Sequence, residues 1–194
     1  MAQAPEGGAV SRRAIITTML AASTLVVTPA WLGYAPALIW NASASVPIGL
    51  YRLAPVERLK IGDYVVVTPP EPLAAFLAGR GYLAPGVPLI KRVLALAGAS
   101  VCRRGATIIA FDHAYGEARE RDSFGRPLPS WQGCRRLAHG EIFLMNWDMP
   151  DSLDGRYFGP LPVTSIVARA LPLWTDADSP GRFHLHVGDP ADAH

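Results

Sequence analysis

A stretch of chain without charged residues begins after Arg13 and lasts until Arg52. Its first part, residues 14–40, is mostly apolar, and about 20 apolar residues in a helix suffice to cross the hydrocarbon core of a bilayer. Two arginines directly before the stretch favour a cytoplasmic N-terminus. The sequence therefore predicts a cytoplasmic segment at 1–13, a transmembrane helix within a membrane anchor at 14–38, and the rest of the chain on the opposite side, which is the periplasm in a Gram-negative cell.

A cleavable signal peptide is the alternative interpretation of this segment. The small-x-small pattern Ala42-Ser43-Ala44 would suit a cleavage site. The apolar stretch is longer than the roughly 7–15 residues of a signal-peptide core, however, and this favours a retained anchor.

The remaining chain predicts one β-rich domain at 39–175 and a loose polar tail at 176–194. Short runs of β-branched and apolar residues, broken by glycine and proline, are typical of strands in an all-β domain. One short helix is expected within 72–81. Strands are expected within 49–53, 59–67, 87–96, 98–102, 107–111, 142–145 and 163–173.

Charge and cysteine content exclude some classes of function. The net charge is only +2 at neutral pH, which gives no support for nucleic-acid binding. Cys102 and Cys134 lie on the predicted external side, where an oxidising compartment permits a disulfide, although two unpaired thiols remain the alternative. These cysteines lack the spacing of a zinc site, so neither a metal nor another cofactor is expected.

Lys91 stands inside an apolar run, 87–96, in a chain whose other basic residues are arginines apart from Lys60. A lysine can lose its proton near neutral pH when burial disfavours its charged form, whereas an arginine stays charged. Ser45 lies in the serine-rich turn after the apolar stretch, and a serine hydroxyl needs such a base to become a good nucleophile. Strand alternation puts Lys91 toward an apolar layer and Arg92 on the opposite face, outward or paired.

Each of these two residues has an ordinary explanation when taken alone. Serines are common in turns, and a lysine at the end of a strand can reach solvent through its long stem. A serine turn directly after the apolar stretch, followed by a lysine in an apolar strand, favours a serine–lysine catalytic dyad formed by Ser45 and Lys91.

Four segments within residues 41–167 resemble, in order, segments of type I signal peptidases. Residues 43–47, Ser-Ala-Ser-Val-Pro, are similar to the nucleophile turn of that family, and residues 62–67 to its Gly-Asp strand. Residues 89–98 resemble the family's lysine strand. Residues 151–159, Asp-Ser-Leu-Asp-Gly-Arg-Tyr-Phe-Gly, resemble its Asp-Ser-Arg-Tyr-Trp-Gly box.

Within that family the closer resemblance is to the conjugative-transfer signal peptidases of the TraF type. Residues 45–51, Ser-Val-Pro-Ile-Gly-Leu-Tyr, are similar to this branch's Ser-x-Pro-x-Gly-x-Tyr turn, and residues 126–135 are also similar to it. Residues 146–148, Asn-Trp-Asp, depart from the Gly-Asp-Asn of general signal peptidases. This departure argues against a general, housekeeping signal peptidase more than it argues against a catalytically active protein.

The resemblance implies a mostly antiparallel, coiled β-domain of the signal peptidase type, and it implies roles for three more residues. Ser43 would contribute its hydroxyl to the oxyanion hole, with a turn-shaping hydrogen bond as an equal alternative. Asp154 and Arg156 would support the site by pairing or by bonding the backbone. In the TraF-type branch the aspartate that matches Asp154 is implicated in the reaction itself.

Together these features predict a membrane-anchored serine endopeptidase, single-pass in the cell inner membrane, with its catalytic domain on the periplasmic side. By resemblance, it would process secreted precursors, above all a conjugative pilin, through an acyl-enzyme that ends in hydrolysis or in cyclisation. The expected partners are the precursor protein, membrane lipid and type IV secretion components, without nucleic acid. The alternatives are a general type I signal peptidase that removes leader peptides and a catalytically inactive, anchored β-scaffold of a secretion system.

Overall fold

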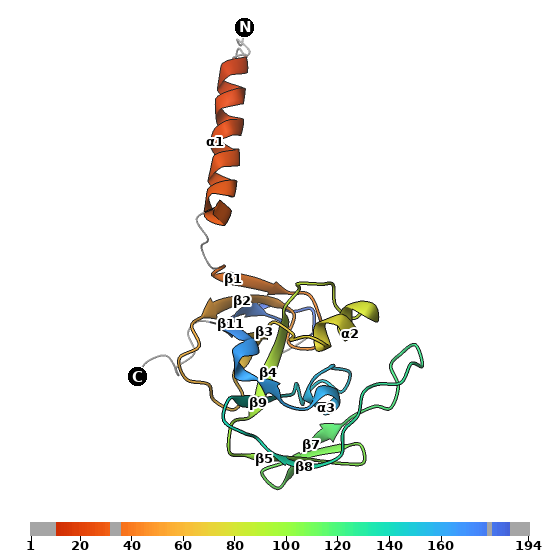
Figure 1. Cartoon of the computed structure of the whole chain (residues 1–194). Coiled ribbons are helices and arrows are strands. Elements are labelled where there is room, and N and C mark those ends of the chain that lie inside the picture. Colours follow the sequence, from red (N-terminus) through yellow and green to blue (C-terminus); the bar gives the residue numbers. More distant parts are fainter. Residues whose placement is uncertain (1–10, 32–35, 178–179, 187–194) are drawn as a thin grey trace. The chain divides into compact units, whose positions relative to one another are not determined.

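The computed structural model describes residues 11–31, 36–177 and 180–186, and the chain divides into two units, 1–36 and 37–194 (Figure 1). The first unit contains one helix, α1 (Arg12–Trp31). At its start the Ser11 hydroxyl accepts the N–H of Ala14 at 3.2 Å, as an N-cap does. Threonine hydroxyls along the helix bond backbone carbonyls three or four residues earlier, at Thr17, Thr18, Thr24 and Thr28.

Among the helices of the described residues, none is both long and apolar enough to pass through a membrane. The transmembrane helix predicted within 14–38 is therefore not supported. The helix α1 ends at Trp31, and residues 38–41 belong to the first strand of the second unit.

The second unit is built from two sheets whose described strand pairs are all antiparallel. The larger sheet has the order β1-β2-β11-β3-β4-β9-β10, with β12 paired to β11, and the smaller has the order β7-β6-β5-β8. The strands are β1 (Leu38–Asn41), β2 (Gly49–Ala54), β3 (Tyr64–Val67), β4 (Leu89–Ala95), β5 (Ser100–Arg104), β6 (Thr107–Ala110), β7 (His113–Glu117), β8 (Gly133–Arg136), β9 (Glu141–Leu144), β10 (Leu161–Pro162), β11 (Ile166–Thr175) and β12 (His184–Leu185). Short helices lie at α2 (Leu73–Gly79), α3 (Gly155–Phe158) and the 3-10 turn Val163–Ser165.

The mostly β character predicted from the sequence is confirmed. The predicted strands correspond to β2, β3, β4, β5, β6, β9 and β11, and the predicted short helix corresponds to α2. Strands β1, β7, β8, β10 and β12 were not predicted. In β8 all four residues are exposed and two are arginines, so it lacks the apolar alternation of a half-buried strand.

Of the predicted loose tail, 176–194, the structure describes residues 176–177 and 180–186, and the rest of that prediction lies outside the described residues. Asp176 bonds the turn between β1 and β2 twice: its Oδ1 accepts the Ile48 N–H at 2.7 Å, and its own N–H donates to the Ile48 carbonyl at 3.1 Å. Further on, β12 pairs with the end of β11, where Trp174 lies opposite Leu185. The polar composition of this segment does not prevent order, because its backbone groups continue the sheet.

Strand β4 lies between β3 and β9 and supplies residues to all three hydrophobic clusters of the second unit. Ile90 packs with residues of β2, β3 and β11, whereas Val93 packs with residues of β3 and β9. Leu94 and Ala95 reach the cluster shared with the smaller sheet. The residues of β4 thus pack on both faces of the strand, and Lys91, in its middle, is buried among them.

We expect the substitution Gly155→Ala to destabilise this fold by about 1–3 kcal/mol, because overpacking a dense site forces its neighbours to shift. A Cβ at this position would lie 2.7 Å from the Leu144 carbonyl oxygen and 2.7 Å from the Phe143 ring. Gly79→Ala is the matched control, since a Cβ there meets nothing within 4 Å. Urea unfolding of both variants tests this, and equal stabilities would contradict the close packing at Gly155.

Candidate active site

Ser45 lies in the turn, residues 42–48, that connects β1 to β2. Asn41, the buried last residue of β1, holds this turn from inside: its Nδ2 donates to the carbonyls of Ser43 and Val46 at 2.7 and 3.1 Å. Its Oδ1 accepts the N–H and the hydroxyl of Ser43 at 3.2 and 3.0 Å. The hydroxyls of Ser43 and Ser45 lie 2.9 Å apart. One buried amide therefore fixes the turn, and Ser45 stays partly open to solvent.

The residues that follow Ser45 in the motif have backbone roles. The hydroxyl of Tyr51, buried in β2, donates to the Pro47 carbonyl at 2.6 Å. Gly49 has φ +145°, and a Cβ there would lie 2.2 Å from the Trp174 carbonyl oxygen of β11. Only glycine can meet both conditions. The Ser-x-Pro-x-Gly-x-Tyr pattern thus describes how the turn is joined to the sheet.

Lys91 is buried in β4, with 4% of its surface exposed. Apolar side chains line the small hollow beside it, among them Val67, Leu89 and Leu144. Burial lowers the pKa of Lys91 to about 8; the nearby carboxylate of Asp154 opposes this shift and the guanidinium of Arg156 adds to it. The amine Nζ donates to the hydroxyl of Ser152 at 2.9 Å. The sequence prediction of a buried lysine in an apolar layer agrees with this geometry.

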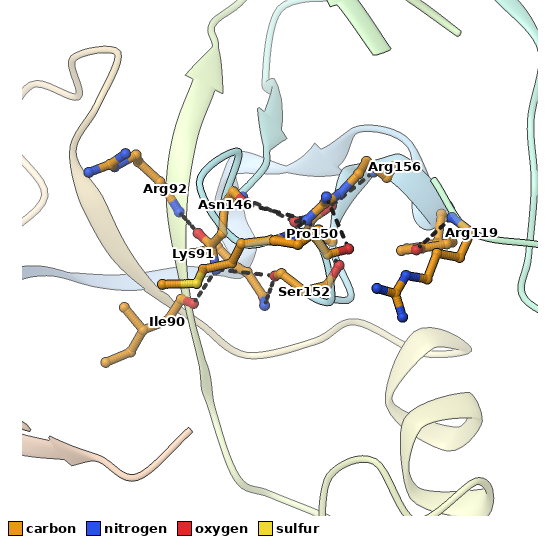
Figure 2. A network of polar contacts seen from close by, with 11 residues as sticks. Ile90, Lys91, Arg92, Arg119, Asn146, Pro150, Ser152 and Arg156 are labelled. Carbon is orange, nitrogen blue, oxygen red and sulfur yellow. Dashed lines mark hydrogen bonds and ion pairs between the residues drawn. The ribbon is translucent and has the colours of Figure 1, made fainter. Parts of the chain in front are cut away.

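Arg156 organises the loop that carries Ser152, as Figure 2 shows. Its side chain is 1% exposed and pairs with Asp154, Nη2 to Oδ2, at 2.9 Å. The same nitrogen donates to the carbonyls of Met149 and Ser152 at 2.6 and 3.2 Å. Asp154 also accepts the N–H of Asn146 at 3.0 Å. The pair therefore ties both ends of the loop together, which is the supporting role expected for Asp154 and Arg156.

Asn146 joins this loop to the lysine strand. Its Oδ1 accepts the N–H of Arg92 at 2.8 Å, and its Nδ2 donates to the Ser152 hydroxyl at 3.2 Å (Figure 2). It is 4% exposed. Asn146 also lines a cleft of about 280 Å³, together with Ser45 and Tyr64.

Arg92 forms a second part of the cleft wall. Its guanidinium carbon lies 4.8 Å from the centre of the Tyr64 ring and 4.5 Å from that of Trp147, distances at which cation–π attraction operates. Its Nη1 pairs with Asp148 at 2.5 Å, and both residues line the cleft. Arg92 thus pairs on the face opposite Lys91, as strand alternation predicts.

The structure brings the proposed site residues into two groups. Ser43 and Ser45 share the nucleophile turn, whereas Lys91, Asp154 and Arg156 share the buried loop network. Among the described residues, no hydrogen bond joins Ser45 directly to Lys91. Asn146 is the link, since it lines the cleft with Ser45 and bonds the hydroxyl that binds Lys91.

Three residues of this arrangement were missed from the sequence: Asn41, Asn146 and Ser152. Ser152 stands inside the Asp-Ser-Leu-Asp segment, so its place in that motif could have singled it out. The two asparagines carried no signal, because an isolated asparagine is ordinary in turns and at strand ends.

The two cysteines lie outside the cleft. Cys102 of β5 and Cys134 of β8 stand opposite each other and form a disulfide within the smaller sheet. Of the two alternatives left open by the sequence, the structure therefore has the bonded form. Nowhere in the described ranges do three or more histidine, cysteine, aspartate or glutamate side chains gather as metal ligands would.

The chain is similar to known proteins over most of its length. The family model described as signal peptidase, peptidase S26, matches residues 11–174. A probable conjugal transfer protein TraF from Sinorhizobium fredii (strain NBRC 101917 / NGR234) is 31% identical over 172 residues, which cover 84% of this chain and 88% of that protein. A plasmid transfer protein TraF from Escherichia coli is 35% identical over 162 residues, 74% of this chain and 85% of that protein. A signal peptidase I structure from Enterococcus faecalis V583 aligns with 58% of this chain and 97% of its own, at 16% identity and a TM-score of 0.35.

We expect Arg156→Gln to lower the free energy of unfolding by about 3–5 kcal/mol, because it leaves the buried Asp154 carboxylate without its partner. Arg119→Gln is the matched control, since Arg119 pairs with Asp151 at the surface, where such a pair contributes about 1 kcal/mol or less. Thermal and urea unfolding would measure both. A loss at Arg156 no larger than that at Arg119 would contradict the supporting role.

Proposed function

Because the chain belongs to the signal peptidase family, peptidase S26, we propose that it is a serine endopeptidase in which Ser45 is the nucleophile and Lys91 the general base. The observation that carries this proposal is the burial of Lys91. A solvated lysine has a pKa near 10.4 and almost no neutral amine at pH 7. With a pKa of about 8, a useful fraction of Lys91 is neutral near physiological pH, and a neutral amine can accept a proton.

The proposed reaction proceeds in two stages. In the first stage Ser45 Oγ bonds the scissile carbonyl carbon and its proton passes to Lys91 Nζ; the C–N bond then breaks and this proton goes to the leaving amine. In the second stage a water or an amine attacks the acyl carbon and gives a proton to Lys91 Nζ; the ester C–O bond then breaks, and this proton returns to Ser45 Oγ. The resting side chains are not hydrogen-bonded, so they must approach when a substrate fills the cleft, as catalytic contacts commonly tighten on binding.

Ser43 is the proposed oxyanion donor, together with the backbone N–H of Ser45. Its hydroxyl lies 2.9 Å from Ser45 Oγ, close to where the oxyanion would form. In the resting turn it also bonds Asn41 Oδ1 at 3.0 Å, so it must rotate toward the substrate as negative charge develops. Donors of this kind contribute about 100- to 1,000-fold to rate.

The substrate we propose is a secreted precursor protein of a conjugative system, above all a pilin. Support comes from the relatives, which are named as conjugal or plasmid transfer proteins. An extended segment of the precursor would enter the cleft beside Ser45. The acyl-enzyme would be released by water, or by the precursor's own N-terminal amine, which would give a cyclic product.

We further propose that this domain works in the periplasm. The disulfide between Cys102 and Cys134 supports an oxidising compartment. Contact with membrane lipid is supported by Trp40 and Trp174, which are partly exposed and lie in one aromatic group with Phe183. Tryptophan favours membrane–water interfaces.

We expect Ser45→Ala and Lys91→Arg each to reduce precursor cleavage by about 10⁴-fold or more, because removal of one member of a catalytic unit abolishes most of its contribution. Arginine keeps the positive charge but cannot act as a base. Lys60→Arg makes the same exchange at an exposed lysine and should retain full activity. Cleavage of a pilin precursor, followed by gel and mass spectrometry, measures all three; full activity of Ser45→Ala would favour the inactive scaffold.

The rate of cleavage should rise with pH. Below pH 8 most of Lys91 is charged and cannot accept a proton, so kcat/KM should climb through a midpoint near the Lys91 pKa of about 8 and level off above it. Initial rates between pH 6 and 10 would show this. A profile that is flat over this range would exclude Lys91 as the base.

The mass of the product distinguishes the two ways of releasing the acyl-enzyme. A product one water lighter than the trimmed linear chain indicates cyclisation, and the linear mass indicates hydrolysis. Equal processing of unrelated Ala-x-Ala precursors by the purified protein would instead favour a general signal peptidase.

A further inference from the structure

Asn146 occupies the point where β9 leaves the lysine strand. The Met145 N–H still donates to the Arg92 carbonyl at 2.9 Å, as in an antiparallel pair. The returning bond of such a pair would run from the Arg92 N–H to the Met145 carbonyl. Here the Arg92 N–H bonds the Asn146 side-chain oxygen instead, at 2.8 Å. An asparagine side chain thus replaces the last backbone acceptor of the ladder, one residue after Lys91.

This contact fixes which way the Asn146 amide faces. A backbone N–H can only donate, so the atom that meets the Arg92 N–H must be the amide oxygen. The amide nitrogen then donates to the Ser152 hydroxyl, 3.2 Å away, and to the Ile90 carbonyl, 3.5 Å away. Ser152 Oγ therefore accepts a hydrogen bond from Asn146, and it cannot turn its own hydrogen in that direction.

The orientation of Ser152 matters for a base. A neutral Lys91 amine has two hydrogens and one lone pair, and the lone pair must stay free if it is to take the proton of Ser45. When Lys91 donates to Ser152, as the 2.9 Å contact allows, the lone pair is free. Ser152 Oγ accepts from both the amide of Asn146 and the amine of Lys91, so the place of this acceptor beside the amine depends on Asn146.

We propose that Asn146 is a positioning residue of the reaction: by bonding the Arg92 N–H and the Ser152 hydroxyl, it holds the Ser152 oxygen beside the Lys91 amine and so influences how readily that amine takes up a proton. This rests on the proposed function for the part that concerns catalysis, but the hydrogen-bond relay itself can be tested without substrate. The charged groups that act on Lys91 besides this relay are Asp154 and Arg156.

The chain offers a direct way to observe this relay, because Lys60 and Lys91 are its only lysines. Protein labelled with ¹³C at lysine Cε gives two side-chain NMR signals, and the exposed Lys60 serves as the internal reference. The chemical shift of Lys91 is followed between pH 5 and 11, and the pH at the midpoint of its titration is measured. The four proteins compared are the unaltered chain, Asn146→Asp, Ser152→Ala and the double variant. Asn146→Asp keeps an acceptor for the Arg92 N–H and replaces the donor to Ser152 by an acceptor.

In Asn146→Asp the hydrogen of Ser152 turns to the new carboxylate, and Ser152 Oγ becomes a stronger acceptor for charged Lys91. The Lys91 midpoint should rise by about one pH unit or more. If Asn146 acts through Ser152, this rise should shrink to less than half when Ser152→Ala is also present. An unchanged midpoint, or an equal rise in both backgrounds, would overturn the proposal, because an equal rise is the direct effect of a nearby charge.

Gln132→Glu is the control for the exchange of an amide for a carboxylate, since Gln132 is exposed and bonds Gly105 in another part of the domain. It should leave the Lys91 midpoint unchanged. Should Asn146→Asp fail to fold, Asn146→Ala enters the same cycle: a shift of the midpoint that vanishes with Ser152→Ala supports the relay, and an absent shift contradicts it.

Kinetics then separate this inference from the proposed function. If Lys91 is the base, the rising limb of kcat/KM in Asn146→Asp should move upward together with the NMR midpoint, with KM nearly unchanged. If the NMR midpoint of Lys91 moves but the rising limb of kcat/KM does not, the relay is supported and Lys91 is rejected as the base. An unmoved midpoint with a normal wild-type limb near pH 8 would reject the relay and leave the base in place.

Discussion

The removal of Lys91 from water is the constraint on which this site depends. A buried ammonium is unfavourable, and the chain reduces this cost by letting the amine lose its proton more readily and by giving it one hydroxyl partner. That partner sits on a loop with little regular structure, so the loop needs a support of its own. The buried pair of Asp154 and Arg156 provides it by bonding the backbone at both ends. The buried pair of Asp154 and Arg156 thus secures the position of the hydroxyl that Lys91 binds.

Ser45, the proposed nucleophile, is held by different means. Its turn is fixed by one buried asparagine, one tyrosine hydroxyl and a glycine that lets β11 pass close by. These contacts exist without substrate, so little conformational entropy has to be lost when a substrate binds. Ser45 of the turn, Arg92 of the lysine strand and Asn146 all line the same cleft. In the proposed reaction the turn and the lysine strand can each stay rigid, and Ser45 and Lys91 approach each other only when a substrate binds.

Much of this arrangement was predictable, and the reasons differ by residue. Ser45 and Lys91 could be proposed because unusual residue types stand in informative surroundings: a lysine in an apolar strand and a serine after an uncharged stretch. The strands with β-branched runs were predictable for the same reason. Asn41 and Asn146 were not, because their roles depend on which backbone groups the folded chain leaves unpaired, and no local pattern records that. The transmembrane helix was predicted from an uncharged, mostly apolar stretch, but among the described helices none is long and apolar enough to cross a membrane.

The bonds between Asp176 and Ile48 have a consequence for when the protein becomes competent. Ser45 is made early in synthesis, but the backbone next to it is completed by a residue about 130 positions later. An emerging polypeptide that lacks this segment has its serine in an unfinished turn. An activity that needs the finished turn would then arise only after nearly the whole domain has been made and has folded.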